Sequence, residues 1–346
     1  MAETDKPEKK KGGWLGRLLI TLLFLIIAGV LVVAATLWFS WNWLQDEVAR
    51  DGPHREEVTL ALPRGSGLIA IANQLESEGV VSSGDVFRAW VTIDGGDRDL
   101  RAGEYAIPAG ASMLEIYELL REGDTIQYLV TAPEGRTSAQ IVRILNANEV
   151  LTGEIAEIPP EGSLLPETYS FHRGDSRQDI LDRMRADQQA LLDELWPNRA
   201  DDLPFETPQE AIILASIVEK ETGEADERPL VAAVFVNRLR RGMRLESDPT
   251  IIYGITQGEP LGRGIRRSEL DNDQNPYNTY FIDGLTPTPI ANPGREAIES
   301  VLNPPESGYL FFVADGTGGH AFAETYREHQ RNVANWRRIE RDRGRR

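Results

Sequence analysis

The most strongly patterned segment of the chain lies beyond its midpoint, where apolar residues fill most positions of a predicted helix. Residues 207–223 read Thr-Pro-Gln-Glu-Ala-Ile-Ile-Leu-Ala-Ser-Ile-Val-Glu-Lys-Glu-Thr-Gly. Thr207 and Glu210 have the spacing of a capping box, and Gly223 is expected to take the left-handed conformation that ends the helix. Because residues 211–218 carry no charge, the pattern predicts a helix that is buried on nearly all sides and ends in a charged last turn.

Two carboxyl groups stand in that last turn, Glu219 and Glu221. Each follows apolar residues at helical spacing, so each is expected at the edge of an apolar core, where removal from water raises the pKa of a carboxyl group. A carboxylic acid that stays protonated near neutral pH can donate a proton to a leaving group. Periodicity alone does not choose between the two residues. Solvated charges at a helix end are the simpler interpretation of both.

A second apolar pattern lies near the start of the chain, where residues 18–39 carry no charge. At about 1.5 Å per residue this run is long enough to cross a hydrocarbon core of about 30 Å. Basic residues precede it, acidic residues follow it, and tryptophans flank it. We therefore expect an uncleaved single-pass helix over 18–40 behind a cytoplasmic tail of residues 1–17. Residues 41–55 are expected to form a linker.

Three copies of a strand-like run, a Pro-x-Gly turn and an amphipathic helix follow this linker. The turns lie at 63–65, 108–110 and 133–135, and apolar residues recur at fixed offsets after each glycine. Each unit is too short to be stable alone, so we expect the three to form one small α+β domain over 56–155, with helices covering a shared sheet. This domain is interpreted either as a spacer or as a glycan-binding module of the LysM type.

The following residues, 156–335, predict a larger domain, which is followed by a basic tail over 336–346. Amphipathic helices and a buried strand are expected in it. The helices are predicted at 180–196, 229–239 and from 325 onward, and the strand at 309–313. The predicted fold class is therefore α+β, with an N-terminal transmembrane helix and two domains after it.

The amino-acid composition excludes several classes of function. The chain has 346 residues, no cysteine and a formal net charge of -18. Thiolate metal ligands, disulfides and cysteine nucleophiles are thereby excluded, and nucleic acid is not expected as a partner because it requires a basic surface. The four histidines lack metal-ligand spacing, so neither a metal nor a cofactor is expected. A glycan held by hydrogen bonds and stacking fits this composition.

Several short motifs of the distal domain resemble the endolytic murein transglycosylase family, the YceG-like proteins. In chain order they are Leu-Ala-Ser-Ile-Val-Glu-Lys-Glu-Thr at 214–222, Val-Asn-Arg-Leu at 236–239, Gly-Met-Arg-Leu at 242–245, Ser-Asp-Pro-Thr at 247–250, Tyr-Asn-Thr-Tyr at 277–280 and Gly-His at 319–320. The chain departs from the family pattern at a few positions. Glu246 stands where glutamine is usual, and Thr286 and Thr288 interrupt a more typical Gly-Leu-Pro-Pro loop.

The resemblance implies a membrane anchor, a LysM-like subdomain and a catalytic domain whose essential residue is the first glutamate of the Glu-Lys-Glu motif, here Glu219. That residue would protonate the bond between N-acetylmuramic acid and N-acetylglucosamine in nascent peptidoglycan strands. It would then accept the proton of the C6 hydroxyl as the 1,6-anhydro ring closes, so that one residue serves as acid and as base. Such a lyase would terminate strand elongation.

The same resemblance implies a location and partners. The protein would lie in the bacterial inner membrane, with its N-terminus in the cytoplasm and its catalytic domain in the periplasm. Peptidoglycan strands, the lipid bilayer and peptidoglycan synthases are the candidate partners. The residues expected to orient the sugar or the carboxyl group are Asn237, Asp248, Tyr253, Asn278 and Tyr280. Turn capping and core packing are the alternative interpretation of each of them.

Two other functions stay open on the sequence alone. Ser216 and Lys220 lie one helical turn apart and would form the dyad of a serine hydrolase acting on stem peptides, although the Ser-x-x-Lys spacing of such enzymes is absent. The chain would otherwise be a non-catalytic, membrane-anchored scaffold that binds peptidoglycan.

Overall fold

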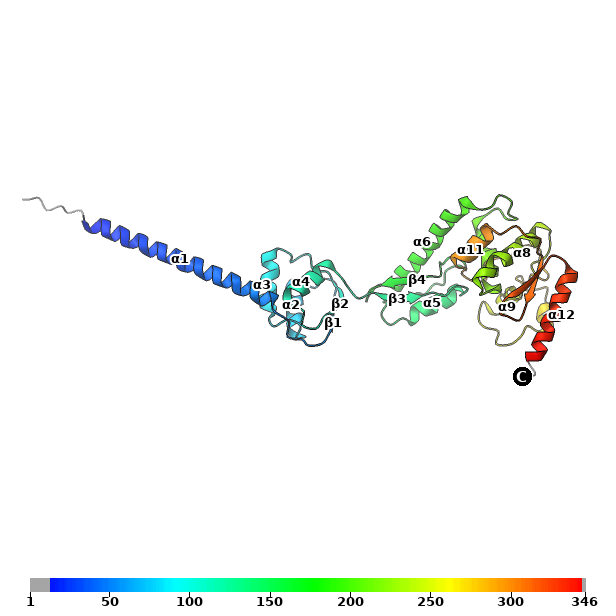
Figure 1. Ribbon diagram of the computed structural model, residues 1–346, viewed down its shortest axis with the longest axis horizontal. Helices are drawn as coiled ribbons and strands as arrows, with labels where there is room; N and C mark the ends of the chain where they lie inside the picture. The colour runs from blue at the N-terminus through cyan, green and yellow to red at the C-terminus, as the bar shows by residue number, and fades with distance from the viewer. Residues whose placement is uncertain (1–12, 344–346) are drawn as a thin grey trace, which may run out of the picture. The chain divides into compact units, whose positions relative to one another are not determined.

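The computed structural model describes residues 13–343 and contains two compact units, which divide between Ile126 and Gln127 (Figure 1). Strands in the described residues form separate antiparallel pairs, each of two strands, and helices pack around them. The predicted α+β class is thereby confirmed. The expected sheet shared by three strand and helix units is wrong, because each hairpin packs against its own set of helices.

Helix α1 (Gly13–Ala49) is longer than the predicted membrane helix. Among the described residues it is the one helix that is long and apolar enough to cross a membrane, and its most apolar window is fully exposed. Its last turns do not form a linker, because Leu44 and Val48 are buried in the core of the first unit. The linker predicted over 41–55 is therefore helical as far as Ala49. Apolar residues on one face of α1 continue beyond the membrane segment and enter that core.

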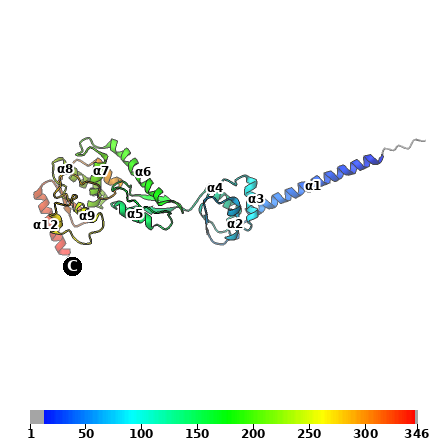
Figure 2. The same ribbon diagram turned by 180° about the vertical axis from the view of Figure 1, so that it is seen from behind.

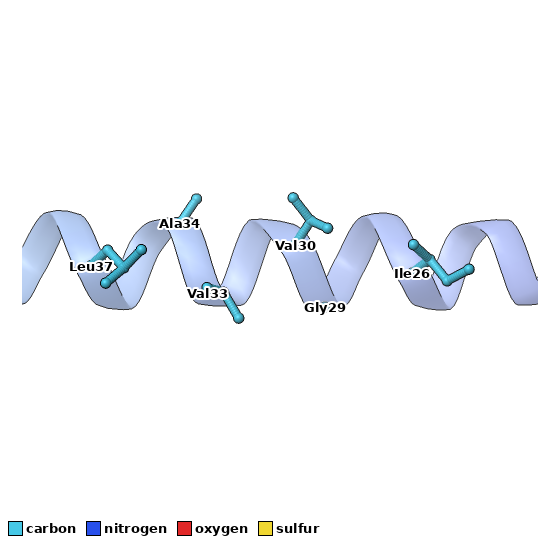
Figure 3. A pocket seen from close by; sticks show the side chains of 6 residues that line it. All are labelled: Ile26, Gly29, Val30, Val33, Ala34 and Leu37. Carbon is cyan, nitrogen blue, oxygen red and sulfur yellow. The ribbon is translucent and has the colours of Figure 1, made fainter.

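A shallow notch lies on one face of α1, at Gly29 (Figure 3). The residues around it recur at the three- and four-residue spacing of one helical face. They are Ile26, Gly29, Val30, Val33, Ala34 and Leu37. Since none of them carries a polar side chain, the notch has no group that could orient a ligand.

The first unit surrounds one β-hairpin with short helices. Strands β1 (Val58–Leu62) and β2 (Gly103–Ile107) pair antiparallel, with Val58 opposite Ile107. The capping box of Ser112 and Glu115 forms as the sequence indicates and begins the last helix of the unit. The helices are α2 (Leu68–Ser77), α3 (Gly84–Asp94) and α4 (Met113–Glu122), and together with the end of α1 they enclose the core.

The third strand and helix copy belongs to the second unit. Strand β3 (Tyr128–Thr131) pairs with β4 (Thr168–Phe171) instead of with the first hairpin, and helix α5 (Ser138–Ala147) packs into the core that α6 (Arg177–Leu195) shares. The compact units thus divide at residue 126 rather than at 155. The repeated sequence pattern does not predict which strand pairs with the strand of each copy.

The rest of the second unit is organised around α7 (Pro208–Glu221), which packs against its neighbouring helices (Figure 2). The capping box at Thr207 and the burial of every residue over 211–218 are confirmed. The predicted stop at Gly223 is wrong, because the helix ends at Thr222 in an extended conformation. The neighbouring helices are α8 (Arg228–Arg240), α9 (Asp248–Thr256) and α11 (Arg295–Leu302).

Shorter elements complete the second unit. A single-turn helix, α10 (Arg267–Leu270), lies in the long loop after α9, and strands β5 (Phe311–Ala314) and β6 (His320–Ala323) form the third hairpin. Helix α12 (Tyr326–Arg343) packs on this hairpin, where His329 stacks on Phe311 with ring centroids 5.2 Å apart. The predicted strand at 309–313 is therefore partly buried rather than fully buried, and the last residues of the basic tail lie outside the described residues.

One buried amide joins three segments of the second unit that are far apart in the sequence. Asn292 is fully buried just before α11, and its Oδ1 accepts the N–H of Leu164 at 3.0 Å. Its Nδ2 donates to the carbonyl of Arg136 and to the hydroxyl of Ser138, each at 3.1 Å. The loop after β3, the loop before β4 and the start of α11 are held together by this side chain.

Asn292→Ala is expected to destabilise the folded protein by about 2–4 kcal/mol, because the buried N–H of Leu164 loses its acceptor and two further hydrogen bonds are lost. Chemical denaturation of the detergent-solubilised protein measures this. Asn198→Ala is the control, since Asn198 donates only to an exposed carbonyl at a helix end. Equal effects of the two substitutions would contradict the role of Asn292.

Candidate active site

The two carboxyl groups in the last turn of α7 lie on different sides of the helix. Glu219 and Glu221 are two residues apart, and two residues correspond to about 200° of rotation around an α-helix. Every residue before them over 211–218 is buried, so both carboxyl groups lie next to other elements of the unit. Their surroundings therefore distinguish the two groups that the sequence pattern leaves equal.

Glu219 lies at the N-terminus of α11. Its side chain is only 6% exposed, and its Oε2 accepts the N–H of Gly294 at 3.1 Å. Burial raises the pKa of Glu219, although the Gly294 N–H and the nearby Arg228 act in the opposite direction. The positive end of the helix dipole and a cation thus compensate the burial of this carboxyl group.

Arg228 links Glu219 to two other carboxylates. Its guanidinium is 6% exposed, forms a close ion pair with Glu296, and lies 3.7 Å from Glu134 and 3.9 Å from Glu219. The Glu134 carboxylate lies so close to Gly294 that a β-carbon at that position would collide with it. A cation, a helix terminus and three carboxylates therefore lie together, and two of the carboxylates, Glu134 and Glu296, are 43% and 63% exposed.

Glu221 has a different environment on the opposite side of α7. It is partly buried, and the hydroxyl of Ser247 donates a short hydrogen bond to its Oε1. Loss of contact with water raises the pKa of Glu221 to about 7. The Ser247 hydrogen bond acts against this shift, whereas the negative charge of Asp248 adds to it. Burial thus raises the pKa of both carboxyl groups in this last turn.

Ser247 donates to Glu221 instead of capping helix α9. It is the N-cap residue of α9, yet its side chain makes no hydrogen bond to the backbone of that helix. A serine cap is worth about 1 kcal/mol. The residue before it, Glu246, has a positive φ of 53°, a conformation that non-glycine residues rarely adopt. The chain is therefore locally less stable at the point where the Ser247 hydroxyl donates to the Glu221 carboxyl group. Such local strain is common at functional sites.

Further motif residues gather around Glu221. The hydroxyl of Tyr280 donates to Asp248 Oδ1 at 2.9 Å, and burial together with this carboxylate raises the pKa of Tyr280. Asp248, Arg238 and His320 all act electrostatically on Glu221. Residues from four of the motifs quoted above thus surround this one carboxyl group, and two of them, Asp248 and Tyr280, were predicted from the sequence.

The other three predicted substrate-binding residues make structural contacts. Asn237 donates to the carbonyls of Ser307 and Tyr309 at 2.9 and 3.1 Å, and so holds the segment before β5. Asn278 is fully buried and donates to two carbonyls of its own loop. Tyr253 belongs to the core around α7, where its ring packs edge-on against Tyr277. These contacts correspond to the turn and core roles that the sequence left as the alternative.

The serine hydrolase dyad does not form. The hydroxyl of Ser216 is fully buried, donates to the carbonyl of Ile213 and accepts the N–H of Ile290 at 3.0 Å. The ammonium group of Lys220 instead donates to the carbonyl of Gly135 at 3.2 Å. Both hydrogen-bonding positions of the serine are therefore occupied within the core, and it has no access to a substrate.

Comparison with known proteins agrees with the motifs. The sequence profile of the YceG-like family matches residues 60–335. The chain belongs to the YceG-like family. A crystal structure of a YceG-like protein from Listeria monocytogenes is 29% identical and aligns with a TM-score of 0.50, covering 80% of this chain and 98% of that one.

Two relatives carry the name endolytic murein transglycosylase. The one from Streptococcus pneumoniae is 31% identical, and the alignment covers 86% of this chain. The one from Bacillus subtilis is 29% identical, with 83% of this chain covered and 86% of that protein. The chain spans 62% of the length of the streptococcal relative.

Replacement of Glu221 by glutamine is expected to stabilise the folded YceG-like protein above neutral pH. The folded-state pKa is raised from 4.5 to about 7, so the folded protein holds an extra proton between these values and loses stability as the pH rises through them. At pH 8, Glu221→Gln should be more stable than the wild type by about 3 kcal/mol relative to the difference near pH 4.5, where the two should be about equal. Denaturation at several pH values measures this, and a constant difference would contradict the raised pKa.

Proposed function

We propose that this protein is an endolytic peptidoglycan lytic transglycosylase, a lyase that cleaves the bond between N-acetylmuramic acid and N-acetylglucosamine and leaves a 1,6-anhydro end. Membership of the YceG-like family and the names of the relatives support this assignment. The observation that carries it is the carboxyl group of Glu219 at the end of α7, which is largely withdrawn from water and whose pKa is raised by that burial. A group of this kind can protonate a leaving oxygen at neutral pH.

Glu219, which the family resemblance implies, is proposed as the acid in preference to Glu221. The acid must approach a glycosidic oxygen and exchange its proton during each turnover. The groups beside Glu219 reach solvent, since the side chains of Glu134 and Glu296 are 43% and 63% exposed, and burial raises the pKa of Glu219. Glu221 accepts the Ser247 hydroxyl and has lost contact with water, so it is the alternative acid.

The reaction requires an acid but no external water. Glu219 donates its proton to the glycosidic oxygen, the bond to C1 of the muramic acid breaks, and the C6 hydroxyl of the same sugar closes on C1. The proton of that hydroxyl needs an acceptor, which is the Glu219 carboxylate itself, since one carboxyl group serves twice. An ordinary glycosidase differs because its second carboxylate acts as a nucleophile or activates water.

The membrane arrangement is part of the proposal. Helix α1 would span the bacterial inner membrane once, with the basic N-terminal segment in the cytoplasm and both units in the periplasm. The enzyme would then meet nascent strands close to the membrane and terminate their elongation, beside peptidoglycan synthases. The first unit would serve as a LysM-like subdomain that binds glycan or positions the catalytic unit.

Two matched variants test the choice of acid. Glu219→Gln is expected to lower the release of 1,6-anhydro products from purified glycan strands by about 10³-fold or more, because the proton donor is removed. Glu221→Gln is expected to keep the same chemistry and to change the pH dependence of stability instead, since the pKa of Glu221 is raised by its loss of contact with water. Mass spectrometry of the products gives the rates, and denaturation gives the stabilities.

The opposite pattern of these two variants would move the acid to Glu221. Full activity in both variants would show that neither carboxyl group takes part in the chemistry. It would favour the alternative of a non-catalytic peptidoglycan-binding scaffold. Arg295→Gln is a suitable control, because its guanidinium makes only exposed ion pairs with Glu194 and Glu299 on α6 and α11.

The proposed orientation can be tested with single cysteines, since the chain contains none of its own. In spheroplasts, a membrane-impermeant maleimide is expected to label Asp201→Cys, which lies at an exposed position of the second unit. It should label Ala2→Cys only after the membrane is permeabilised. Labelling of Ala2→Cys in intact spheroplasts would place the N-terminus outside and contradict the proposal.

A further inference from the structure

A groove of about 430 Å³ lies in the second unit, between the first turns of α5 and the loop that follows α9. Charged and apolar side chains both line it. The charged ones are Arg136, Arg143 and Glu259, and the apolar ones are Ile144, Ala147 and Pro260. None of these residues belongs to the motifs that indicate the family, and the proposed mechanism gives none of them a role.

Contacts between α5 and the loop after α9 hold the two sides of this groove together. Nε2 of Gln140 donates to the carbonyl of Gly258 at 2.9 Å. Arg143 and Glu259 form an ion pair across the groove lining. A β-carbon at Gly258 would collide with the side chain of Thr137, so the loop approaches α5 as closely as a glycine allows. The groove is therefore a preformed feature of the second unit.

The turn before α5 connects this groove to the proposed acid. A β-carbon added to Gly135 would lie 3.6 Å from Cγ of Glu219, so the backbone of this glycine packs directly on the side chain of the acid. Arg136 follows Gly135, and its carbonyl accepts the N–H and the Nδ2 of Asn292 at 2.9 and 3.1 Å. The chain is thus fixed at the point where the groove begins, one residue away from the contact with Glu219.

Arg136 is the uncompensated cation of this groove. The charge of Arg143 is neutralised by Glu259. The side chain of Arg136 is exposed, and within residues 13–343 its guanidinium has no ion pair or hydrogen bond. A guanidinium with free N–H groups can donate two parallel hydrogen bonds to a carboxylate. The groove therefore suits a ligand that combines a carboxylate with small apolar groups.

The substrate of the proposed reaction carries such groups next to the bond that is cut. A stem peptide is attached through a lactyl ether to C3 of the muramic acid whose C1–O bond breaks. Its D-glutamate is linked through the side chain and so keeps a free α-carboxylate, and its alanines carry methyl groups. None of the described residues that line the groove is aromatic, so it has no surface on which a sugar ring could stack.

We propose that this groove binds the stem peptide of the muramic acid at the cleavage site, with the Arg136 guanidinium paired to the α-carboxylate of the D-glutamate. This inference rests on the proposed transglycosylase function and assigns the peptide part of its substrate to a second site. Ile144 and Ala147 contact the alanine methyl groups. A peptide held one residue from the acid places the glycosidic oxygen of its own sugar at Glu219, and not that of the neighbouring N-acetylglucosamine, which has no peptide.

The choice of substrate tests this site. With full-length protein in detergent, Arg136→Gln is expected to lower kcat/KM about tenfold on glycan strands that carry stem peptides, mainly through KM, because a charged hydrogen-bond partner is lost. On strands stripped of their peptides by an amidase, Arg136→Gln and the wild type should be equal. Arg136→Lys should recover only part of the loss, since it keeps the charge without the two-pronged geometry.

Arg185→Gln is the matched control. Arg185 is an arginine of the same unit that pairs with Asp182 of its own helix, α6, and does not line the groove. Its replacement removes the same charge and should leave kcat/KM unchanged on both kinds of strand.

A binding measurement tests the same contact without turnover. The probe is the free tetrapeptide L-Ala-γ-D-Glu-meso-diaminopimelyl-D-Ala, titrated calorimetrically into the full-length Glu219→Gln protein. Adding Arg136→Gln is expected to raise its Kd about tenfold, and amidation of the D-glutamate α-carboxylate should raise it as much in the protein that keeps Arg136. The two changes should not add, because they remove the same contact.

The outcomes separate this inference from the proposed function. Equal losses on peptide-bearing and peptide-free strands, with or without a lower melting temperature, would refute the peptide site, and so would unchanged kcat/KM on peptide-bearing strands. Failure of the tetrapeptide to bind, or equal binding with and without Arg136, would refute it as well. Full activity of Glu219→Gln would instead overturn the proposed acid, and the calorimetric titration would still decide the role of Arg136.

Discussion

The second unit depends on the complete burial of α7. Eight consecutive residues, 211–218, are buried, and helices α8, α9 and α11 all pack around them. A helix enclosed in this way can present polar groups only at its ends. Its N-terminus is closed by the capping box at Thr207, so the chemistry that the helix can offer is confined to the carboxyl groups of its last turn.

The helical repeat then places these carboxyl groups in different surroundings. Glu219 accepts the Gly294 N–H at the start of α11 and lies 3.9 Å from a buried arginine, and both contacts lower its pKa while burial raises it. Glu221 accepts the Ser247 hydroxyl, and loss of contact with water together with the negative charge of Asp248 raises its pKa. The proposed acid is thus the carboxyl group beside partly exposed carboxylates, and the other carboxyl group lies against the start of α9.

The sequence predicted the parts of the unit that local rules control. The capping box and the buried run of α7 follow from residue spacing within one helix. Spacing does not distinguish Glu219 from Glu221, because their surroundings depend on Arg228 and Ser247, which tertiary packing brings to opposite sides of α7. The same limit applies to β3, whose pairing with β4 no repeat pattern indicates, and to Leu44, which extends α1 into a core beyond the membrane segment.

The continuity of α1 also constrains where the first unit can lie. Leu44 and Val48 are core residues of that unit, while the strongly apolar segment of the same helix ends only a few residues before Leu44, at Phe39. If this run crosses a bilayer, as proposed, no flexible segment separates the hydrocarbon from the first hydrophobic core. The first unit would then be held at the membrane surface as a rigid extension of the anchor. A module in that position can meet a strand only as it leaves the membrane, which fits an enzyme that acts on nascent rather than mature peptidoglycan.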